Sequence, residues 1–397
     1  MKLVVMKDDK HLFGFPRNVF VLSLVSFFND IGGETIKRAI PLFLTNALGV
    51  KPAVIGFIEG IAEATPQLFQ PISGYVSDVT QKRKPLILLG QAMRTSMLFL
   101  FWAMSWPAVL LLRFLDRSGK GISNAPRDAL ISLSTSDTHK GKSFGLNRAF
   151  DNAGAVVGMI SASVIILFFS SGSLVMTHDI FRGIVLLAAV PLALSLSIVF
   201  LFLRDIPRTH HHPRWILHNG LGHRYYVFLF FSFLFTLGNS SDAFLILKAQ
   251  QSGIALWQIF LLLAGYSFVS SVSGLPFSNL SDRVGRKKLM VTGWLLYSVV
   301  YALFAATSKA PVIIGLFLLY GLYYGLTEGA AKALIADVVP KERYGTAYGV
   351  YNMVVGATLF PASLLAGFLW QTFAPAVALS TSSIMAAVAA LGFLFFL

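Results

Sequence analysis

Long apolar stretches recur along the chain and alternate with short polar segments. Each stretch holds about 20 residues or more, enough for a helix to cross a hydrocarbon core about 30 Å thick. Strand-like alternation is absent, and glycine and proline lie within the stretches. This excludes a transmembrane barrel and fits helices that pack against one another. The pattern predicts an all-α membrane protein.

Twelve spans can be placed along the sequence. They lie near residues 18–46, 53–78, 85–105, 108–133, 144–170, 181–203, 224–247, 254–280, 288–307, 310–337, 345–370 and 375–396. One long polar connection divides them into two groups of six. We therefore expect an N-terminal six-helix bundle (1–203), a cytoplasmic linker (204–223) and a C-terminal six-helix bundle (224–397).

Composition supports a membrane protein, since 55% of the residues are hydrophobic and 13% are charged, against roughly a quarter charged in soluble domains. The net charge of +14 does not indicate a nucleic-acid partner, because Lys and Arg form short clusters between spans rather than one patch. The clusters fall in alternate loops, for example at 82–84 and 286–288. By the positive-inside rule both termini are cytoplasmic.

The chain also aligns with itself when it is shifted by about 204 residues. The matching segments are Asp78 with Asp282, 82–84 with 286–288, 129–131 with 333–335, and 141–145 with 345–349. Four matches in register indicate an internal duplication. We expect two pseudo-symmetric six-helix bundles around a site near the membrane midplane.

The loop after the second span begins with Gly74, has Asp78 four residues later and continues into Lys82 and Arg83. This pattern resembles the signature of the major facilitator superfamily, and Asp282 and Arg286 repeat it in the second half. Segments 113–128, 28–34 and 325–329 also resemble that family, in particular a prokaryotic branch similar to drug/proton antiporters. The resemblance implies a transporter of a prokaryotic cytoplasmic (inner) membrane that works by alternating access.

A cytoplasmic gate is expected where these signatures lie. Asp78 can accept hydrogen bonds from the N-terminus of a helix in the other half and pair with Arg83, so that opening toward the cytoplasm breaks a local charge contact. Topology charges alone are the alternative. The candidate gate residues are Gly74, Asp78, Lys82, Arg83, Arg127, Asp128, Arg148, Asp282 and Arg286.

Ionisable residues within spans are costly, so each is a functional candidate. A proton-coupled carrier needs a buried carboxylate that exchanges a proton against a cation or cargo contact. We expect Asp30 and Glu34 to face Arg113 and to serve in this way, followed by Glu63 and Asp151. Static ion pairs that hold the bundle together are the alternative.

Polar and aromatic residues in the same spans suit a cargo cavity, although the tyrosines could equally be packing residues. Glu328 and Lys332 are four apart, and we expect them to neutralise each other. The cavity candidates are Asn29, Lys37, Arg38, Asn147, Asn239, Asp242, Tyr323, Tyr324, Glu328, Tyr351 and Asn352.

Other function classes find little support. There is no cysteine, no phosphate-binding loop and no catalytic or cofactor fingerprint, and we take the 210–212 histidines as solvated linker. We expect no enzyme activity, no cofactor and no metal site. The expected partners are a small-molecule substrate, protons and the lipid bilayer, with no nucleic acid, and the protein acts as a monomer.

The sequence therefore predicts a proton-coupled secondary transporter that exports a small organic solute. An importer of an anionic metabolite or metal chelate is the alternative, favoured by Lys37 and Arg38. A membrane sensor or assembly factor that does not transport is the alternative from another class.

Overall fold

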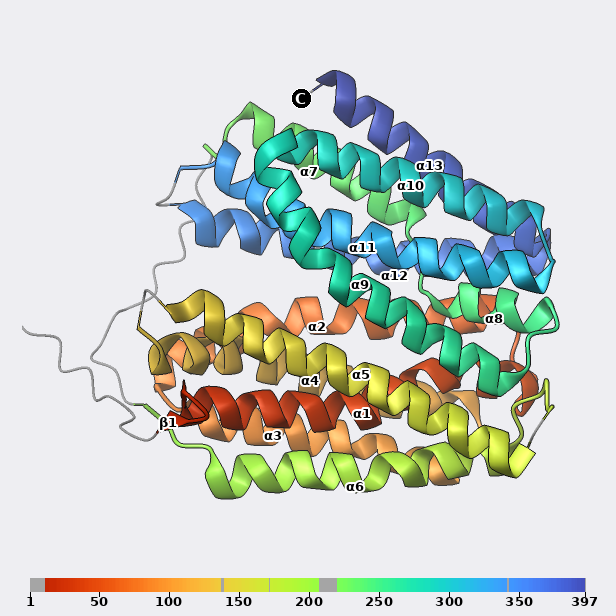
Figure 1. Cartoon of the computed structure of the whole chain (residues 1–397), viewed down its shortest axis with the longest axis horizontal. Coiled ribbons are helices and arrows are strands. Elements are labelled where there is room, and N and C mark those ends of the chain that lie inside the picture. The colour runs from red at the N-terminus through yellow and green to blue at the C-terminus, as the bar shows by residue number, and fades with distance from the viewer. Residues whose placement is uncertain (1–10, 137–138, 171, 207–219, 341–342, 397) are drawn as a thin grey trace, which may run out of the picture.

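The computed structural model describes residues 11–136, 139–170, 172–206, 220–340 and 343–396 (Figure 1). Its helices form two groups that lie side by side, α1–α6 and α7–α13. A short hairpin, β1 (His11–Leu12) and β2 (Phe15–Pro16), precedes the first helix. The segment 207–219, which holds the central part of the expected linker and the histidine triplet, lies outside the described residues.

The first group contains six spans, and the third of them ends in a 3-10 turn, η1. Their bounds are α1 Arg17–Asn46, α2 Pro52–Thr80, α3 Arg83–Thr95 with η1 Ser96–Trp102, α4 Trp106–Ser134, α5 Lys140–Ser170 and α6 His178–Phe202. Prolines in the first turns of α2 and α4 suit helix starts, because those N–H groups have no partner within the helix. The Thr177 side chain accepts a hydrogen bond from the Ile180 N–H and so caps α6.

The second group also contains six spans, one of them built from two short helices. The bounds are α7 His223–Gly238 with α8 Ala243–Gln251, α9 Leu256–Val284, α10 Arg286–Ala306, α11 Ala310–Val338, α12 Tyr344–Thr372 and α13 Pro375–Phe396. Twelve spans in two six-helix groups are thus present among the described residues, as the sequence predicts.

The seventh span is not the continuous helix that the sequence predicts. Its helical structure stops at Gly238 and resumes at Ala243, and residues 239–242 are unwound between them. The local sequence explains the break, since Gly238 is followed by Asn239, Ser240, Ser241 and Asp242, which all favour helix ends over helix interiors. The break leaves backbone and polar side chains at the centre of the bundle.

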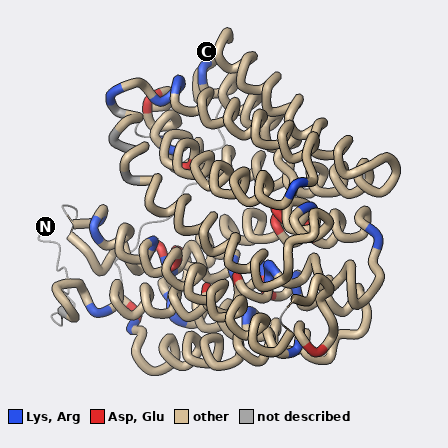
Figure 2. Tube along the Cα trace, turned by 45° about the vertical axis from the view of Figure 1, so that its right-hand side comes forward, with Lys and Arg blue, Asp and Glu red and all other residues tan. Residues whose placement is uncertain are grey.

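Ten stretches of the described residues are long and apolar enough to cross a membrane, and α2 and α4 are not among them. Both helices are too polar for that criterion, because α2 carries Glu59 and Glu63 and α4 carries Arg113, Asp116 and Arg117. These charges are compatible with a span only where they are paired or face a polar cavity. Figure 2 shows that the charges inside the bundle concentrate in the first half.

The repeat offset of 204 residues reappears in the helix boundaries. Helix α2 (52–80) becomes α9 (256–284), and α4 (106–134) becomes α11 (310–338) when 204 is added to each boundary. The α1 segment 35–38 corresponds by the same shift to the unwound segment 239–242. The two halves therefore share one architecture and differ in how the first span of each is built.

The halves touch most closely along α2 with α12 and α5 with α9. Small residues permit the approach: a Cβ atom on Gly60 would lie 2.8 Å from the Phe360 carbonyl oxygen, and one on Gly367 would lie 2.6 Å from that of Pro52. Such small-residue contacts are the usual way in which membrane helices approach closely.

Hydrogen bonds between the halves concentrate toward one end of the molecule. Ser173 accepts one from the Leu256 N–H at 3.1 Å, and the Ala53 N–H donates to Gln371 at 3.2 Å. We call this end, marked by Lys51, Ser173 and Lys309, the sealed end. The opposite end, marked by Lys82 and Arg204, is the basic end.

Candidate functional site

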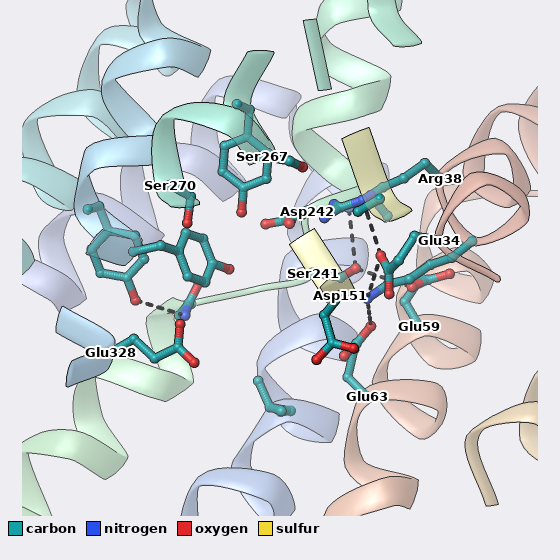
Figure 3. A pocket seen from close by; sticks show the side chains of 18 of the residues that line it. Glu34, Arg38, Glu59, Glu63, Asp151, Ser241, Asp242, Ser267, Ser270 and Glu328 are labelled. Carbon is teal, nitrogen blue, oxygen red and sulfur yellow. Dashed lines mark hydrogen bonds and ion pairs between the residues drawn. The ribbon is translucent and has the colours of Figure 1, made fainter. Parts of the chain in front are cut away.

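A cavity of about 620 Å³ lies between the two halves (Figure 3). Helices α1, α2, α4 and α5 line it from the first half, and α8, α9, α11 and α12 line it from the second. Its volume is within the range of about 300–1,000 Å³ that is typical of pockets for drug-sized ligands. The unwound segment 239–242 forms part of its wall.

The cavity wall is rich in charge, and carboxylates outnumber cations. Seven carboxylates and five basic side chains line it: Asp30, Glu34, Glu59, Glu63, Asp151, Asp242 and Glu328; Lys37, Arg38, Lys120, Arg148 and Lys332. The second half contributes tyrosines instead, at Tyr266, Tyr323, Tyr324 and Tyr351. One wall is therefore mainly ionic and the other mainly aromatic.

An ion pair joins the two walls. Arg38 of α1 donates from Nη1 to the Asp242 Oδ2 of the unwound segment at 2.7 Å, and Tyr320 donates to the other carboxylate oxygen at 2.8 Å. Arg38 and Asp242 are 204 residues apart, as are Asn46 and Gln250, whose side-chain amides bond to each other nearer the sealed end. Residues in equivalent positions of the repeat thus meet where the halves face each other.

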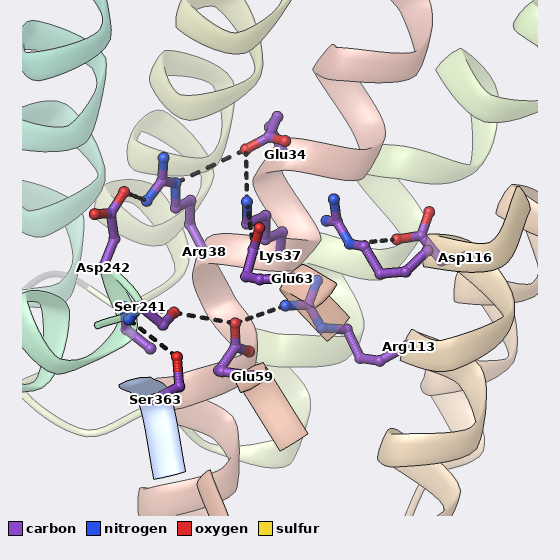
Figure 4. A network of polar contacts seen from close by, with 12 residues as sticks. Glu34, Lys37, Arg38, Glu59, Glu63, Arg113, Asp116, Ser241, Asp242 and Ser363 are labelled. Carbon is purple, nitrogen blue, oxygen red and sulfur yellow. Dashed lines mark hydrogen bonds and ion pairs between the residues drawn. The ribbon is translucent and has the colours of Figure 1, made fainter. Parts of the chain in front are cut away.

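A second network links the ionic wall to the same segment (Figure 4). Arg113, fully buried on α4, donates to Glu59 Oε2 of α2 at 2.7 Å, and the Ser241 hydroxyl donates to the same oxygen at 3.3 Å. The expectation that Arg113 faces Asp30 and Glu34 is wrong. Glu59 on the neighbouring helix is nearer and accepts the hydrogen bond of the guanidinium, and both residues are buried.

The proton-coupling candidates other than Arg113 all line the cavity. Glu63 forms a 2.9 Å ion pair with Lys37, whereas Glu34 lies 4.0 Å from Lys37 and 3.9 Å from Arg38. Asp30 lies 3.8 Å from Arg94. Asp151 has no ion-pair partner among the described residues. Of the four carboxylates, only Glu63 is therefore in a close ion pair; Asp30 and Glu34 lie 3.8 Å or more from their nearest cation, and Asp151 has no such partner among the described residues.

Most of the cargo candidates line the cavity as well. They are Lys37, Arg38, Asn239, Asp242, Tyr323, Tyr324, Glu328 and Tyr351. The Asn239 amide bonds to the Tyr323 hydroxyl at 3.4 Å, which fixes the first residue of the break.

Three asparagines predicted for the cavity lie elsewhere. Asn29 is buried within the first half, where its amide nitrogen donates to Gln91 at 2.8 Å and its amide oxygen accepts from Ser195 at 3.1 Å. Asn147 donates to Ser26 at 2.9 Å and ties α5 to α1. Asn352 is exposed on α12 and is not among the lining residues. An amide that is satisfied between helices does not need a cavity.

The candidate gate residues of the first signature lie at the basic end. Asp78 is exposed and lies 3.9 Å from Arg83, within its own half. The backbone N–H of Arg83 donates to Asp205, which fastens the start of α3 to the end of α6. Lys82 is exposed, and a Cβ on Gly74 would touch Ala125 of α4.

In the second half, Arg286 pairs with Asp337 and donates to the Ala333 carbonyl. The side chain of Asp282 lies outside the described part of the chain. The second signature therefore ties the start of α10 to α11, as the first ties α3 to α6.

The remaining gate candidates, Arg127, Asp128 and Arg148, do not form one cluster. Arg127 pairs with the adjacent Asp128 at 3.2 Å and also reaches Ser26. Arg148 pairs with Glu328 across the halves, so the expected neutralisation of Glu328 by Lys332 is wrong. The cation of the other half lies nearer to the carboxylate than its own helix neighbour does.

Several residues that the structure brings to the cavity or beside it were not singled out as site residues from the sequence, although the charged ones count among the ionisable residues in spans. Glu59, Lys120 and Tyr266 line it, and Arg94 and Asp116 form an ion pair at 3.6 Å beside it. The spacing of Glu59 and Glu63, four residues apart, places both on one face of α2 and was the available signal.

A membrane-spanning helical bundle that encloses a polar cavity between two repeated halves defines an integral membrane transporter. The chain belongs to the Major Facilitator Superfamily, whose family model matches residues 22–235 and 226–397. This confirms the resemblance seen in the sequence, and membership of a transporter family means that the protein is not an enzyme.

Known relatives agree with this assignment. An uncharacterised MFS-type transporter of Methanocaldococcus jannaschii is 35% identical over 98% of this chain and 96% of its own. The multi-drug resistance efflux pump PmrA of Streptococcus pneumoniae is 24% identical over 81% of this chain and 82% of its own. The crystal structure of a POT family transporter in complex with a thioalcohol conjugated peptide has a TM-score of 0.81 at 14% identity. It covers 99% of this chain and 98% of that chain, and it supports the fold alone.

Proposed function

We propose that this transporter is a secondary carrier that exports a small organic solute by alternating access in exchange for protons. The observation that carries the proposal is the carboxylate-rich cavity between two repeated halves, whose hydrogen bonds to each other concentrate toward the sealed end among the described residues. In this proposal the transporter works as a monomer, because one chain supplies both walls of the cavity. It lies in the cytoplasmic membrane of a prokaryote, with both termini in the cytoplasm.

Proton exchange is assigned first to Asp151, Asp30 and Glu34. A carboxylate held in a tight ion pair gains a proton only at the cost of that pair, whereas one without a close cation can exchange a proton without breaking a contact. Asp151 has no ion-pair partner among the described residues, and the nearest cations of Asp30 and Glu34 are 3.8 and 3.9 Å away, so Glu34 ranks with Asp30. Glu63 pairs with Lys37 at 2.9 Å, so it ranks behind them.

Export is supported by the relative that is named as a multi-drug resistance efflux pump. The charge of the cavity supports a neutral or cationic cargo, because Lys37 and Arg38 are occupied by Glu63 and Asp242. A second candidate function, import of an organic anion, is favoured by Lys120 and Lys332. Both line the cavity without an ion-pair partner among the described residues.

A liposome assay with a trapped pH dye tests the proposal. Purified protein is reconstituted, and organic cations and organic anions are screened for movement that depends on a proton gradient. We expect one cargo class to drive proton flux in the wild type, and we expect Asp151→Asn to lose the flux. Asp179→Asn, which changes a carboxylate that is 92% exposed on α6, is the matched control and keeps it.

Active cargo movement without proton flux, unchanged in Asp151→Asn and Glu34→Gln, would contradict the coupling and leave a facilitator. Flux with anions alone would establish the second candidate function.

A further inference from the structure

The Arg38 side chain belongs to one half and lies against a site built by the other. Arg38 is a residue of α1, yet its guanidinium pairs with Asp242 of the second half at 2.7 Å. The central carbon of the guanidinium lies 5.7 Å from the centroid of the Tyr266 ring. Only 8% of the residue is exposed. The second half therefore already binds a planar cation.

The site around this guanidinium has the composition of a cation cage. Tyr320 donates to the Asp242 carboxylate at 2.8 Å and stacks on Tyr266 with ring centroids 5.4 Å apart. Tyr324 stands nearly perpendicular to both rings, at 5.8 and 5.5 Å. A fixed carboxylate next to aromatic faces attracts organic cations by charge and by the ring quadrupole. We call Asp242, Tyr266, Tyr320 and Tyr324 the tyrosine cage.

The cage opens onto the cavity, since Asp242, Tyr266 and Tyr324 are all lining residues. Figure 3 shows Asp242 at this cavity. All four cage residues belong to the second half, whereas the occupant belongs to the first. The contact is therefore one of the ties between the halves, and it must break if they separate at the sealed end.

Arg38 has a second partner within reach on its own helix. The Glu34 carboxylate lies 3.9 Å from Arg38 Nε, and that nitrogen has no hydrogen-bond partner among the described residues. A guanidinium displaced from the cage can turn to Glu34 without losing a charge partner (Figure 4). This lowers the cost of exchange, because a buried arginine without a partner is strongly unfavourable.

We propose that Arg38 is a tethered competitor of the cargo: the tyrosine cage binds a planar organic cation of the guanidinium or amidinium type, which displaces Arg38 and releases the tie between the halves. This rests on the proposed export function and names its cargo class and recognition residues. Cargo binding and the release of this tie between the halves thus become one event, because both require the Asp242 carboxylate.

Binding measurements on the full-length protein in detergent test this directly. Phenylguanidinium is titrated by calorimetry into the wild type and Arg38→Gln, with neutral phenylurea as the shape-matched ligand. We expect Arg38→Gln to bind phenylguanidinium at least about ten-fold more tightly, since removing an internal competitor restores the intrinsic affinity of the site. Phenylurea should bind neither protein measurably.

Arg182→Gln is the matched control, because it removes a guanidinium that also pairs with an aspartate, Asp179, and lies over an aromatic ring, Phe101, but is not among the cavity residues. Its affinity for phenylguanidinium should stay within about three-fold of the wild type, as expected for a general charge effect. Asp242→Asn should abolish binding in both the wild-type and Arg38→Gln backgrounds. If Arg38→Gln does not fold, Arg38→Lys, which keeps the charge and loses the planar fork, should give intermediate affinity.

Equal affinities of wild type and Arg38→Gln, an equal gain in Arg182→Gln, or retention of binding in Asp242→Asn would overturn the inference. None of these results depends on transport. Cage binding without proton flux in liposomes would reject the proposed coupling alone, and proton-coupled transport without cage binding would reject this inference alone.

Discussion

Buried charge pairs are the residue-scale feature that most constrains the molecule. Arg113 and Glu59 are 0% and 1% exposed, and Arg113 Nε and Nη1 and Glu59 Oε1 have no hydrogen-bond partner among the described residues. Two charges that are incompletely satisfied in a membrane core add little net stability as a pair. Each nevertheless depends on the other, and Glu59 also holds Ser241 of the unwound segment.

Arg113→Met is therefore expected to destabilise the protein by about 3–5 kcal/mol, because it leaves Glu59 as an uncompensated buried charge. The additional change Glu59→Gln should restore most of that loss. Equilibrium unfolding in mixed micelles with increasing SDS measures both. Arg148→Met is the control: it breaks a pair whose side chains are 55% and 40% exposed, and it should cost at most about 1 kcal/mol. A loss in the double variant as large as in the single one would show that Glu59 is not the cause.

The site residues that could be predicted from the sequence are the charged ones, because a charge within a span is restricted to a polar environment. A charged residue in a span must face a cavity or a partner, so Glu63, Asp151 and Arg38 could be placed from their position in the sequence. Amides lack that constraint, and Asn29 and Asn147 are satisfied between helices. Pairing across the halves, such as Arg148 with Glu328, depends on tertiary distance and leaves no trace in local spacing.

At the scale of elements, equivalent helices of the two halves carry different kinds of side chain toward the centre of the molecule. Adding 204 to positions on α4 turns Asp116 into Tyr320 and Lys120 into Tyr324 on α11. The same frame thus carries ions in one half and aromatic rings in the other. The duplication and the spans follow from periodicity and hydropathy, but the break at 239–242 requires attention to a short polar run inside an apolar stretch.

The contact between α2 and α12 sets how tightly the sealed end closes. A methyl group on Gly56 would meet the Ser363 carbonyl, so Gly56→Ala should push the helices apart and favour opening there. The chain has no cysteine, so spin labels can be placed at Lys51→Cys and Lys309→Cys, both exposed at this end. We expect the distance distribution from double electron–electron resonance to shift toward longer values.

Gly315→Ala on α11 is the matched control, because a methyl group there meets nothing within 4 Å. It should leave the distribution unchanged. A similar shift in both variants would attribute the effect to helix propensity and not to the contact between the halves.

For the whole molecule, the direction of transport depends on which side of the membrane the sealed end faces. The basic clusters predict that Lys82 is cytoplasmic and Lys51 external. The structure would then be open toward the cytoplasm, and the position of Asp78, beside Arg83 of its own half, would be that of a released latch.

Single-cysteine labelling in intact cells, read out on the purified protein, tests this orientation, because the chain has no cysteine of its own that could react. A membrane-impermeant maleimide should label Lys51→Cys in intact cells and Lys82→Cys only after the membrane is made permeable, since both positions are exposed. The opposite labelling would place the sealed end in the cytoplasm. In that case the structure is outward-open, Asp78 lies on the outer face, and it cannot be a cytoplasmic latch.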